Sequence, residues 1–131
     1  MAEVNRPLSP HLQVYRWQLH MFLSIMHRMT GSALAVGTLL IAWGLIAVAS
    51  GPDAYGVFRD FVSSILGRLI LFGFTIALMQ HLCSGVRHLL MDTGALFEPK
   101  ANRRSGVIVL VCSISLTVVV WVAGYYTAGA F

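Results

Sequence analysis

The chain has 131 residues, of which 57% are hydrophobic and only 11% are charged. Soluble domains carry roughly 25% charged residues, so a water-soluble fold of this length could not cover its surface with so few. Composition therefore excludes the soluble class and favours a membrane protein. The formal net charge of +4 does not indicate nucleic-acid binding, because the basic residues are scattered around apolar runs.

The two cysteines, Cys83 and Cys112, lie inside apolar segments. There is no Cys-x-x-Cys-His sequence for covalent haem attachment and no zinc-site spacing, so we interpret both as buried free thiols that act as small hydrophobic side chains. The first 20 residues are polar rather than basic and then apolar, which fits neither a cleavable signal nor an obvious transit peptide. This pattern favours a bacterial or organelle-encoded protein.

Residues 1–21 are predicted to form an extended arm at the membrane surface. Pro7 and Pro10 disfavour a regular helix there. Tyr15 and Trp17 are suited to the membrane–water interface, where amphipathic rings are enriched.

The first membrane-spanning helix is predicted over residues 22–50. Its uncharged part, Thr30 to Ser50, reaches the length of about 20 residues that a span needs. The sequence Gly51-Pro52-Asp53 is typical of a turn and ends this helix. The connection that follows, up to Arg68, contains regularly spaced apolar residues and is predicted to include a short interfacial helix.

Two further spans are predicted, over residues 69–90 and 106–126. Between them, the polar loop from Met91 to Ser105 contains Pro99, which we expect to break any helix. The third span is rich in β-branched residues, which are tolerated because the membrane enforces helical structure. The expected fold is therefore an all-α membrane protein, a single domain of residues 1–131 with three transmembrane helices and an N-terminal surface arm.

The distribution of Lys and Arg predicts the orientation. Of the nine such residues, all but Arg59 and Arg68 fall on the side of the N-terminal arm and the second loop. Cytoplasmic segments carry an excess of Lys and Arg, so the N-terminus is predicted to be cytoplasmic. A bacterial cytoplasmic (inner) membrane is favoured over the mitochondrial inner membrane.

The segment from Gln80 to Asp92 contains the candidate site. His81 lies inside an apolar run, and ionisable residues at such a depth usually face the protein interior and are functional candidates. His81, Gly85 and His88 have the spacing i, i+4, i+7 and share one helical face, on which Gly85, having no side chain, would let a flat ligand lie close to the backbone. A second face, on the first helix, carries four residues at the spacing i, i+3, i+4, i+7, namely Ser24, His27, Arg28 and Gly31. Both faces are expected at similar depth.

The spacing along the helix distinguishes the histidines by depth. His88 is about 10 Å of helix from His81, which leaves His81 in the hydrocarbon zone and His88 near the surface. A neutral imidazole at the depth of His81 suits haem iron, while His27, Arg28 and His88 lie where propionates would need partners. No other histidine lies as deep as His81. A six-coordinate haem would therefore need a ligand from another chain; otherwise the iron is five-coordinate.

Each of these residues also has a structural interpretation. His81 could form a hydrogen bond across a helix interface, and Arg28 could extend to lipid phosphates. Ser24 could bond to its own helix, and Trp17 could serve as an interfacial anchor.

Three motifs nevertheless resemble a known family, the cytochrome b556 large anchor subunit of succinate dehydrogenase. They are Arg-Pro-Leu-Ser-Pro-His-Leu from Arg6, Ser-Ile-Met-His-Arg-Met-Thr-Gly from Ser24 to Gly31, and His-x-x-x-Gly-Val-Arg-His-Leu-x-x-Asp from His81 to Asp92. The resemblance covers nearly the whole chain, in order and with the same three-span topology.

The resemblance implies a subunit that is not catalytic alone. It would pair with a second small membrane-anchor subunit and hold one haem b with it. The pair would dock a flavoprotein subunit with FAD and a subunit with iron–sulfur clusters. Succinate would be oxidised at the flavin, and its electrons would reach ubiquinone. Two alternatives remain: a structural anchor without haem, and the equivalent anchor of a quinol:fumarate reductase.

The resemblance also assigns roles to residues. His81 matches the axial haem-iron ligand. The quinone site would include Ser24, Arg28, Ile25 and Trp17, and the haem propionates would meet His27 and Arg28, with His88 a weaker candidate. Two departures stand out: His20 replaces a proline found in mitochondrial relatives, and Cys83 and Ser84 replace bulkier or apolar residues near the expected haem face.

Overall fold

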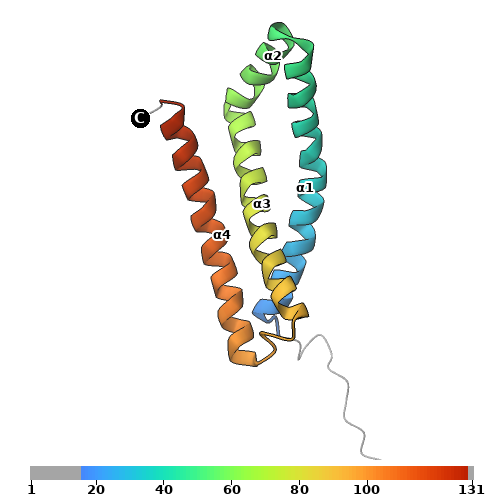
Figure 1. The fold of residues 1–131 in the computed structure, drawn as a ribbon, viewed down its shortest axis with the longest axis vertical. Coiled ribbons are helices and arrows are strands. Elements are labelled where there is room, and N and C mark those ends of the chain that lie inside the picture. Colours follow the sequence, from blue (N-terminus) through green and yellow to red (C-terminus); the bar gives the residue numbers. More distant parts are fainter. Residues whose placement is uncertain (1–15, 130–131) are drawn as a thin grey trace, which may run out of the picture.

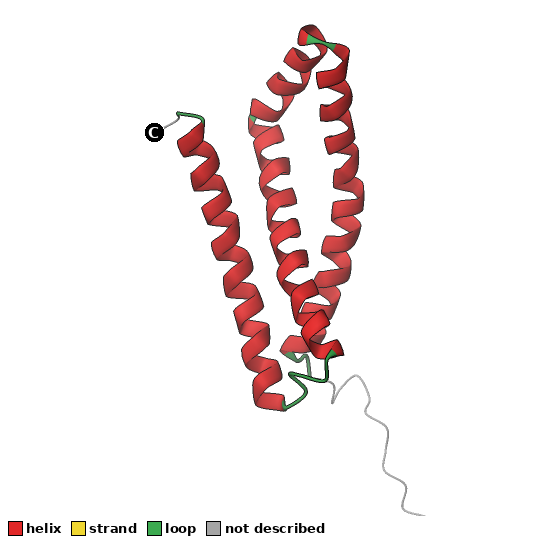
Figure 2. Ribbon diagram, viewed as in Figure 1, coloured by secondary structure: helices red, strands yellow, loops and turns green. Residues whose placement is uncertain are grey.

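The computed structural model describes residues 16–129, and all regular structure within them is helical (Figures 1 and 2). The four helices are α1 (Leu19–Ser50), α2 (Pro52–Ser63), α3 (Ile65–Asp92) and α4 (Pro99–Thr127). Three of them, α1, α3 and α4, are long and apolar enough to cross a membrane. The predicted all-α fold with three spans is therefore confirmed.

The long helices run side by side and alternate in direction (Figure 1). Helix α3 lies between α1 and α4, and the short helix α2 closes the far end of the α1–α3 pair. The start of α1, the end of α3 and the start of α4 lie together at one end of the bundle, which we call the N-terminal end. The first turns of α1 and the last turns of α3 are therefore neighbours.

Helix α1 begins earlier than predicted, at Leu19, so the last part of the expected arm is helical. The extra turn packs against α4. A β-carbon on Gly106 would lie 2.9 Å from a methyl carbon of Leu19 and 2.9 Å from one of Leu23, and Leu23 is only 1% exposed. His20 lies in this first helical turn. The arm before residue 16, including Tyr15, lies outside the described residues.

The starts of α3 and α4 also differ from the prediction. Helix α3 starts at Ile65 because Ser64 caps it, with its Oγ accepting a hydrogen bond of 3.1 Å from the amide of Gly67. Helix α4 starts at Pro99, which was expected to break a helix. Proline is favoured at the first helical position, because its missing N–H would have no intrahelical partner there.

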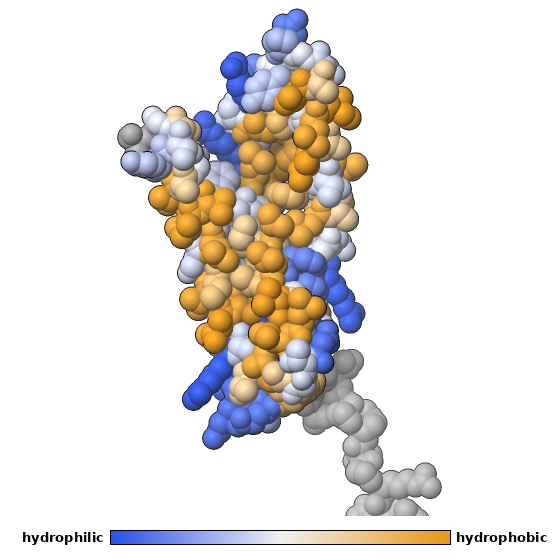
Figure 3. Space-filling view, viewed as in Figure 1, coloured by the Kyte–Doolittle hydropathy of each residue, from blue (hydrophilic) through white to orange (hydrophobic). Residues whose placement is uncertain are grey.

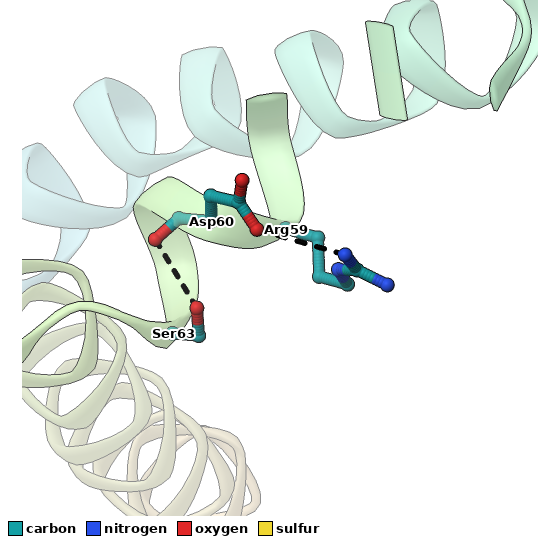
Figure 4. A network of polar contacts seen from close by, with 3 residues as sticks. All are labelled: Arg59, Asp60 and Ser63. Carbon is teal, nitrogen blue, oxygen red and sulfur yellow. Dashed lines mark hydrogen bonds and ion pairs between the residues drawn. The ribbon is translucent and has the colours of Figure 1, made fainter. Parts of the chain in front are cut away.

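Helix α2 is the short helix expected between the first two spans. Gly51 precedes it with a φ of 107°, a conformation that favours glycine. Its polar contacts are weak: Arg59 and Asp60 form an exposed pair at 3.7 Å, and the Ser63 hydroxyl donates to the backbone carbonyl of Asp60 (Figure 4). Aromatic packing holds it more firmly, because the rings of Phe58 and Phe61 each lie 5.1 Å from that of Trp43 on α1.

The exterior of the bundle is more apolar than its interior. On the face that Figure 3 shows, apolar side chains cover most of the middle of the molecule, and hydrophilic residues gather toward its two ends and at one edge. The buried side chains, in contrast, are mostly polar or charged. This distribution fits a surface covered by lipid or by partner helices. The prediction of two buried cysteines is wrong for Cys112, which is exposed in this chain; Cys83 is half-buried, and both are free.

Helix α3 presents one polar face to each neighbour. The face toward α4 carries Gln80, which accepts a 2.7 Å hydrogen bond from the Ser113 hydroxyl. About two helical turns after Gln80, the buried guanidinium of Arg87 donates to Ser105 at 3.0 Å and to the side-chain oxygen of Asn102 at 3.1 Å. These bonds join the last turns of α3 to the first turns of α4. The face toward α1 carries the histidines.

Candidate functional site

Three histidines meet between α1 and α3, and we call them the histidine cluster: His27, His81 and His88. The rings of His27 and His81 are stacked, with centroids 4.0 Å apart and planes only 8° from parallel. The ring of His88 approaches His27 edge-on, with centroids 4.9 Å apart and an angle of 66°. The two faces predicted from the spacing of these residues therefore meet. The expectation that no other histidine lies as deep as His81 is wrong, because the ring of His27 stacks directly on that of His81.

The ring of His81 is held on one side by the backbone of α1. Its Nδ1 lies 3.2 Å from the carbonyl oxygen of His27 and 3.3 Å from Oγ1 of Thr30. Thr30 is itself buried, and its hydroxyl also lies within 3.0 Å of two backbone carbonyls, those of Met26 and His27. These contacts fix how the imidazole is oriented between the two helices.

Two glycines line the cluster, and they differ in how closely a histidine ring approaches them. A β-carbon on Gly31 would lie 3.1 Å from Cε1 of His81, so this glycine gives the imidazole its space. A β-carbon on Gly85 would lie 3.8 Å from Cε1 of His27, which is ordinary contact. The sequence indicated that Gly85 would let a flat ligand lie close to the backbone. Within this chain, however, Gly31 has the closer contact with a histidine ring.

His27 carries a buried polar atom without a partner. In the part of the chain that the structure describes, its Nδ1 has no hydrogen-bond partner. A buried nitrogen in this state is costly, and native structures usually supply a partner from protein, water or ligand. The cluster is not a self-contained metal cage, since residues 16–129 contain no group of three His, Cys, Asp or Glu side chains arranged to hold an ion.

The predicted quinone-site residues on α1 lie beside the cluster but face outward. Ser24 is half-buried, Ile25 is 41% exposed, and Arg28 is exposed. Several hydroxyl residues of α1 bond to their own helix, as Ser32 does to the carbonyl of Arg28 at 3.2 Å. Within residues 16–129 the hydroxyl of Ser24 makes no such bond, so the alternative that Ser24 only bonds to its own helix is not supported.

Trp17 lies apart from these residues. It is 68% exposed and lines a cavity of about 720 Å³ together with residues at the start of α4, among them Asn102 and Arg103. Ser24 and Arg28 are not part of this cavity. The structure therefore does not bring Trp17 into one enclosed pocket with the other three predicted residues of the quinone site.

Cys83 and Ser84, which form the second departure from the family pattern, lie away from the cluster. Cys83 lines a groove between α3 and α4, with Arg87 and Cys112 among its neighbours. Ser84 is fully buried and, like Gln80 and Arg87, lies on the α4-facing side of α3, with no hydrogen-bond partner among the described residues. The expectation that these two positions alter packing against the histidine face is therefore not supported.

Sequence reasoning missed two polar residues that organise the region. From the sequence alone, Thr30 has no role of its own beyond a place in a family motif and at the start of an uncharged run, although its spacing of i+3 from His27 is a usable signal. Arg87 likewise appears only within a motif and in the charge distribution, yet it is 4% exposed and bonds two side chains of α4. Nothing in the order of residues indicated that Asn102 and Ser105 would be its partners.

Fold and site together define a three-span helical membrane protein with a polar interior and a histidine cluster between two of its spans. The chain belongs to the succinate dehydrogenase/fumarate reductase transmembrane subunit family, whose model matches residues 2–120. This confirms the resemblance found in the sequence, and with it the expectation that the chain is a membrane anchor of an enzyme complex.

Individual relatives agree. The chain is 45% identical to the succinate dehydrogenase cytochrome b556 subunit of Paracoccus denitrificans over 121 residues, which cover 90% of this chain and 93% of that protein. It is 40% identical to the subunit of the same name from Rickettsia felis over 118 residues, 90% of this chain and 92% of the relative. It is also 40% identical to the mitochondrial cytochrome b560 subunit of Sus scrofa, covering 84% of this chain and 66% of that protein.

Proposed function

We propose that this chain is a membrane-anchor subunit of succinate:ubiquinone oxidoreductase. It would bind haem b together with a second anchor subunit and contribute to the site that reduces ubiquinone. The names of the relatives, cytochrome subunits of succinate dehydrogenase, support this function. The observation that carries it is the position of His81, which belongs to a membrane-spanning helix. Its Nδ1 contacts the backbone of α1, and its Nε2 is left to bind a ligand.

The histidine cluster fits a haem. A neutral imidazole is a common iron ligand, and Nδ1 of His81 already has its partners on α1, so Nε2 is the ligating atom. The haem, when bound, supplies one-electron transfer. The buried Nδ1 of His27 supports the assignment further, because it has no partner within residues 16–129 and a propionate oxygen could provide one. His88 and Arg28 would add donors for the propionates from the N-terminal end.

The second axial ligand would come from the partner anchor subunit. The rings of His27 and His81 stack face to face with centroids 4.0 Å apart, which leaves no room for an iron between them. His27 therefore cannot be the opposite ligand in this arrangement. His88 lies on the same helix as His81 and therefore could not reach the opposite face of a haem bound by His81. A histidine from the second anchor would complete the site.

For the quinone, the available donors lie on α1. Ser24 and Arg28 are one helical turn apart, and within residues 16–129 neither side chain has a hydrogen-bond or ion-pair partner. Both can donate to a quinone carbonyl and stabilise the negative charge that develops during reduction. Ile25 would form part of the apolar wall, and Trp17 would contribute from the interface. Since Ile25 and Arg28 are exposed in this chain, partner subunits would have to close the pocket.

The catalytic partners would dock at the N-terminal end. They are a flavoprotein subunit with FAD and an iron–sulfur subunit, which deliver electrons from succinate. This end carries the exposed basic residues Lys100, Arg103 and Arg104, which supports a cytoplasmic N-terminus in a bacterial inner membrane. Electrons would then enter close to the quinone-site residues of α1.

The direct test is optical. The complex is purified through a tag on this chain, and the dithionite-reduced minus oxidised spectrum is recorded. A b-type α band is expected in the wild type and should be lost in His81→Ala, while the control His20→Ala, at an exposed position outside the cluster, should keep it. A wild-type complex that assembles without any such band would mean a structural anchor without haem, and the proposal would be wrong.

A further inference from the structure

We propose that Thr30 is a positioning residue for His81. Its hydroxyl oxygen and the backbone carbonyl of His27 together keep a proton on Nδ1 of His81, which leaves Nε2 as the metal-binding nitrogen. The inference rests on the proposed function in one respect, namely that His81 binds haem iron.

The protonation of Nδ1 follows from its two neighbours. The carbonyl oxygen of His27, 3.2 Å away, can only accept a hydrogen bond. The hydroxyl of Thr30, 3.3 Å away, can donate only one proton, and two backbone carbonyls compete for it: that of Met26 at 2.8 Å and that of His27 at 3.0 Å. Its oxygen therefore meets Nδ1 as an acceptor. With acceptors on both sides, Nδ1 carries the hydrogen, and in a neutral ring Nε2 carries the lone pair.

Thr30 also helps to fix the plane of the ring. The imidazole of His81 is stacked on His27 at 4.0 Å, and Gly31 lies against its Cε1 edge. Rotation of the ring toward another orientation would break the contacts of Nδ1 with Thr30 and with the His27 carbonyl. Metal-binding histidines generally donate their second N–H to a carbonyl or another acceptor, which sets the tautomer and raises the basicity of the ligand.

A simpler role for Thr30 would be to satisfy only its own helix. Threonines in helices often do so by bonding to a carbonyl three or four residues earlier, as the exposed Thr38 does with Ala35 at 2.6 Å. Thr30 differs from Thr38 because it is buried at 6% exposure and its oxygen also contacts a side chain of another helix. Thr38 is therefore a matched control, with the same side chain on the same helix but no contact with the cluster.

The test uses the purified complex with its haem. Thr30→Val keeps the shape of the side chain and removes the acceptor; Thr30→Ser restores it, and Thr38→Val is the control. Three properties are measured: the midpoint potential of the haem by redox titration, the g values of the oxidised haem by electron paramagnetic resonance, and haem retention against a competing apo-haem protein. None of them depends on turnover.

In Thr30→Val, Nδ1 keeps only the His27 carbonyl, so the ligand donates less charge and stabilises ferric iron less. We expect an upward shift of the midpoint potential, altered g values and roughly 10-fold weaker haem retention. Thr30→Ser should lie close to the wild type, and Thr38→Val should match it. If Thr30→Val does not assemble, Thr30→Ala is measured in its place.

A Thr30→Val or Thr30→Ala complex with the wild-type potential, g values and retention would overturn the positioning role while leaving the proposed function intact. A wild-type complex without haem would remove both. A potential shift of equal size in Thr38→Val would also contradict the inference, because it would show a general effect of removing a hydroxyl from α1.

Discussion

A β-carbon on Gly31 would lie 3.1 Å from Cε1 of His81, so the imidazole occupies the space beside this glycine and leaves little room for a side chain. His81 has little freedom to move aside, because its Nδ1 contacts Thr30 and the His27 carbonyl. We expect Gly31→Ala to displace the imidazole by a few tenths of an ångström and to weaken haem binding by about 1–3 kcal/mol, the usual range for overpacking. The haem content per complex measures this directly.

Two glycines of α3 provide controls for this prediction about Gly31. A β-carbon on Gly85 would make only ordinary contact, at 3.8 Å from His27, and one on Gly73 would meet nothing within 4 Å. Alanine at Gly73 should leave haem content unchanged, and alanine at Gly85 should have at most a small effect. A loss of haem in Gly85→Ala that equals the loss in Gly31→Ala would mean that Gly85 lies against a partner group, as sequence reasoning suggested.

Arg87 is predicted to hold α3 and α4 together. It is 4% exposed, and its guanidinium donates to Ser105 and Asn102, while Asn102 also donates to the backbone carbonyl of Leu96 in the connecting loop. Arg87→Met should cost about 2 kcal/mol, since hydrogen bonds from a charged group contribute about 1.5–3 kcal/mol and the loss of a buried charge offsets part of this. Thermal unfolding in detergent, followed by helicity, measures the effect. Arg104→Met, at an exposed position, should leave the midpoint unchanged.

Much of the fold could be predicted because membrane spans depend on composition and length alone. The pairing of the His27 and His81 faces also followed from helical spacing and from the reversal of direction between successive spans. The starts of the helices were less predictable. Proline breaks a helix at an interior position but is favoured at the first helical position, and the sequence alone did not distinguish these two cases for Pro99.

The orientation of single side chains within the bundle could not be predicted. The sequence places Gln80 and His81 next to each other, yet Gln80 bonds to Ser113 on α4 while His81 contacts Thr30 on α1. Which face of a helix meets which neighbour depends on how tightly small residues allow the helices to approach. That in turn depends on contacts such as the one between Gly31 and His81, which arise from residues far apart in the chain.

Gly67 is predicted to be essential for the corner between α2 and α3. A β-carbon there would collide with backbone atoms, the carbonyl oxygen of Phe61 and, at 2.7 Å, Cα of Val62. Backbone cannot yield as a flexible side chain can, so Gly67→Ala should destabilise the protein by about 3 kcal/mol or more. Gly56→Ala, where a β-carbon would meet nothing within 4 Å, is the matched control on α2. Equal unfolding midpoints for the two variants would contradict the close approach at this corner.

Arg28 is predicted to act on the quinone. It is not expected to stabilise the fold of this chain, because it is exposed and has no ion-pair partner within residues 16–129. If its guanidinium stabilises charge on the quinone oxygen, Arg28→Ala should lower the rate of ubiquinone reduction by succinate roughly 10-fold or more, the loss expected for one charge-assisted hydrogen bond.

Succinate oxidation with an artificial dye as acceptor should be unchanged in this variant, since the flavin would still receive electrons. Ser24→Ala should show a smaller loss of the same kind, because a neutral donor contributes less than a charged one. Arg68→Ala, an exposed arginine on α3 at the opposite end of the bundle, should leave both activities at the wild-type level. If Arg28→Ala keeps full ubiquinone reduction with normal haem content, Arg28 has no part in quinone chemistry and serves only as a contact for lipid phosphates.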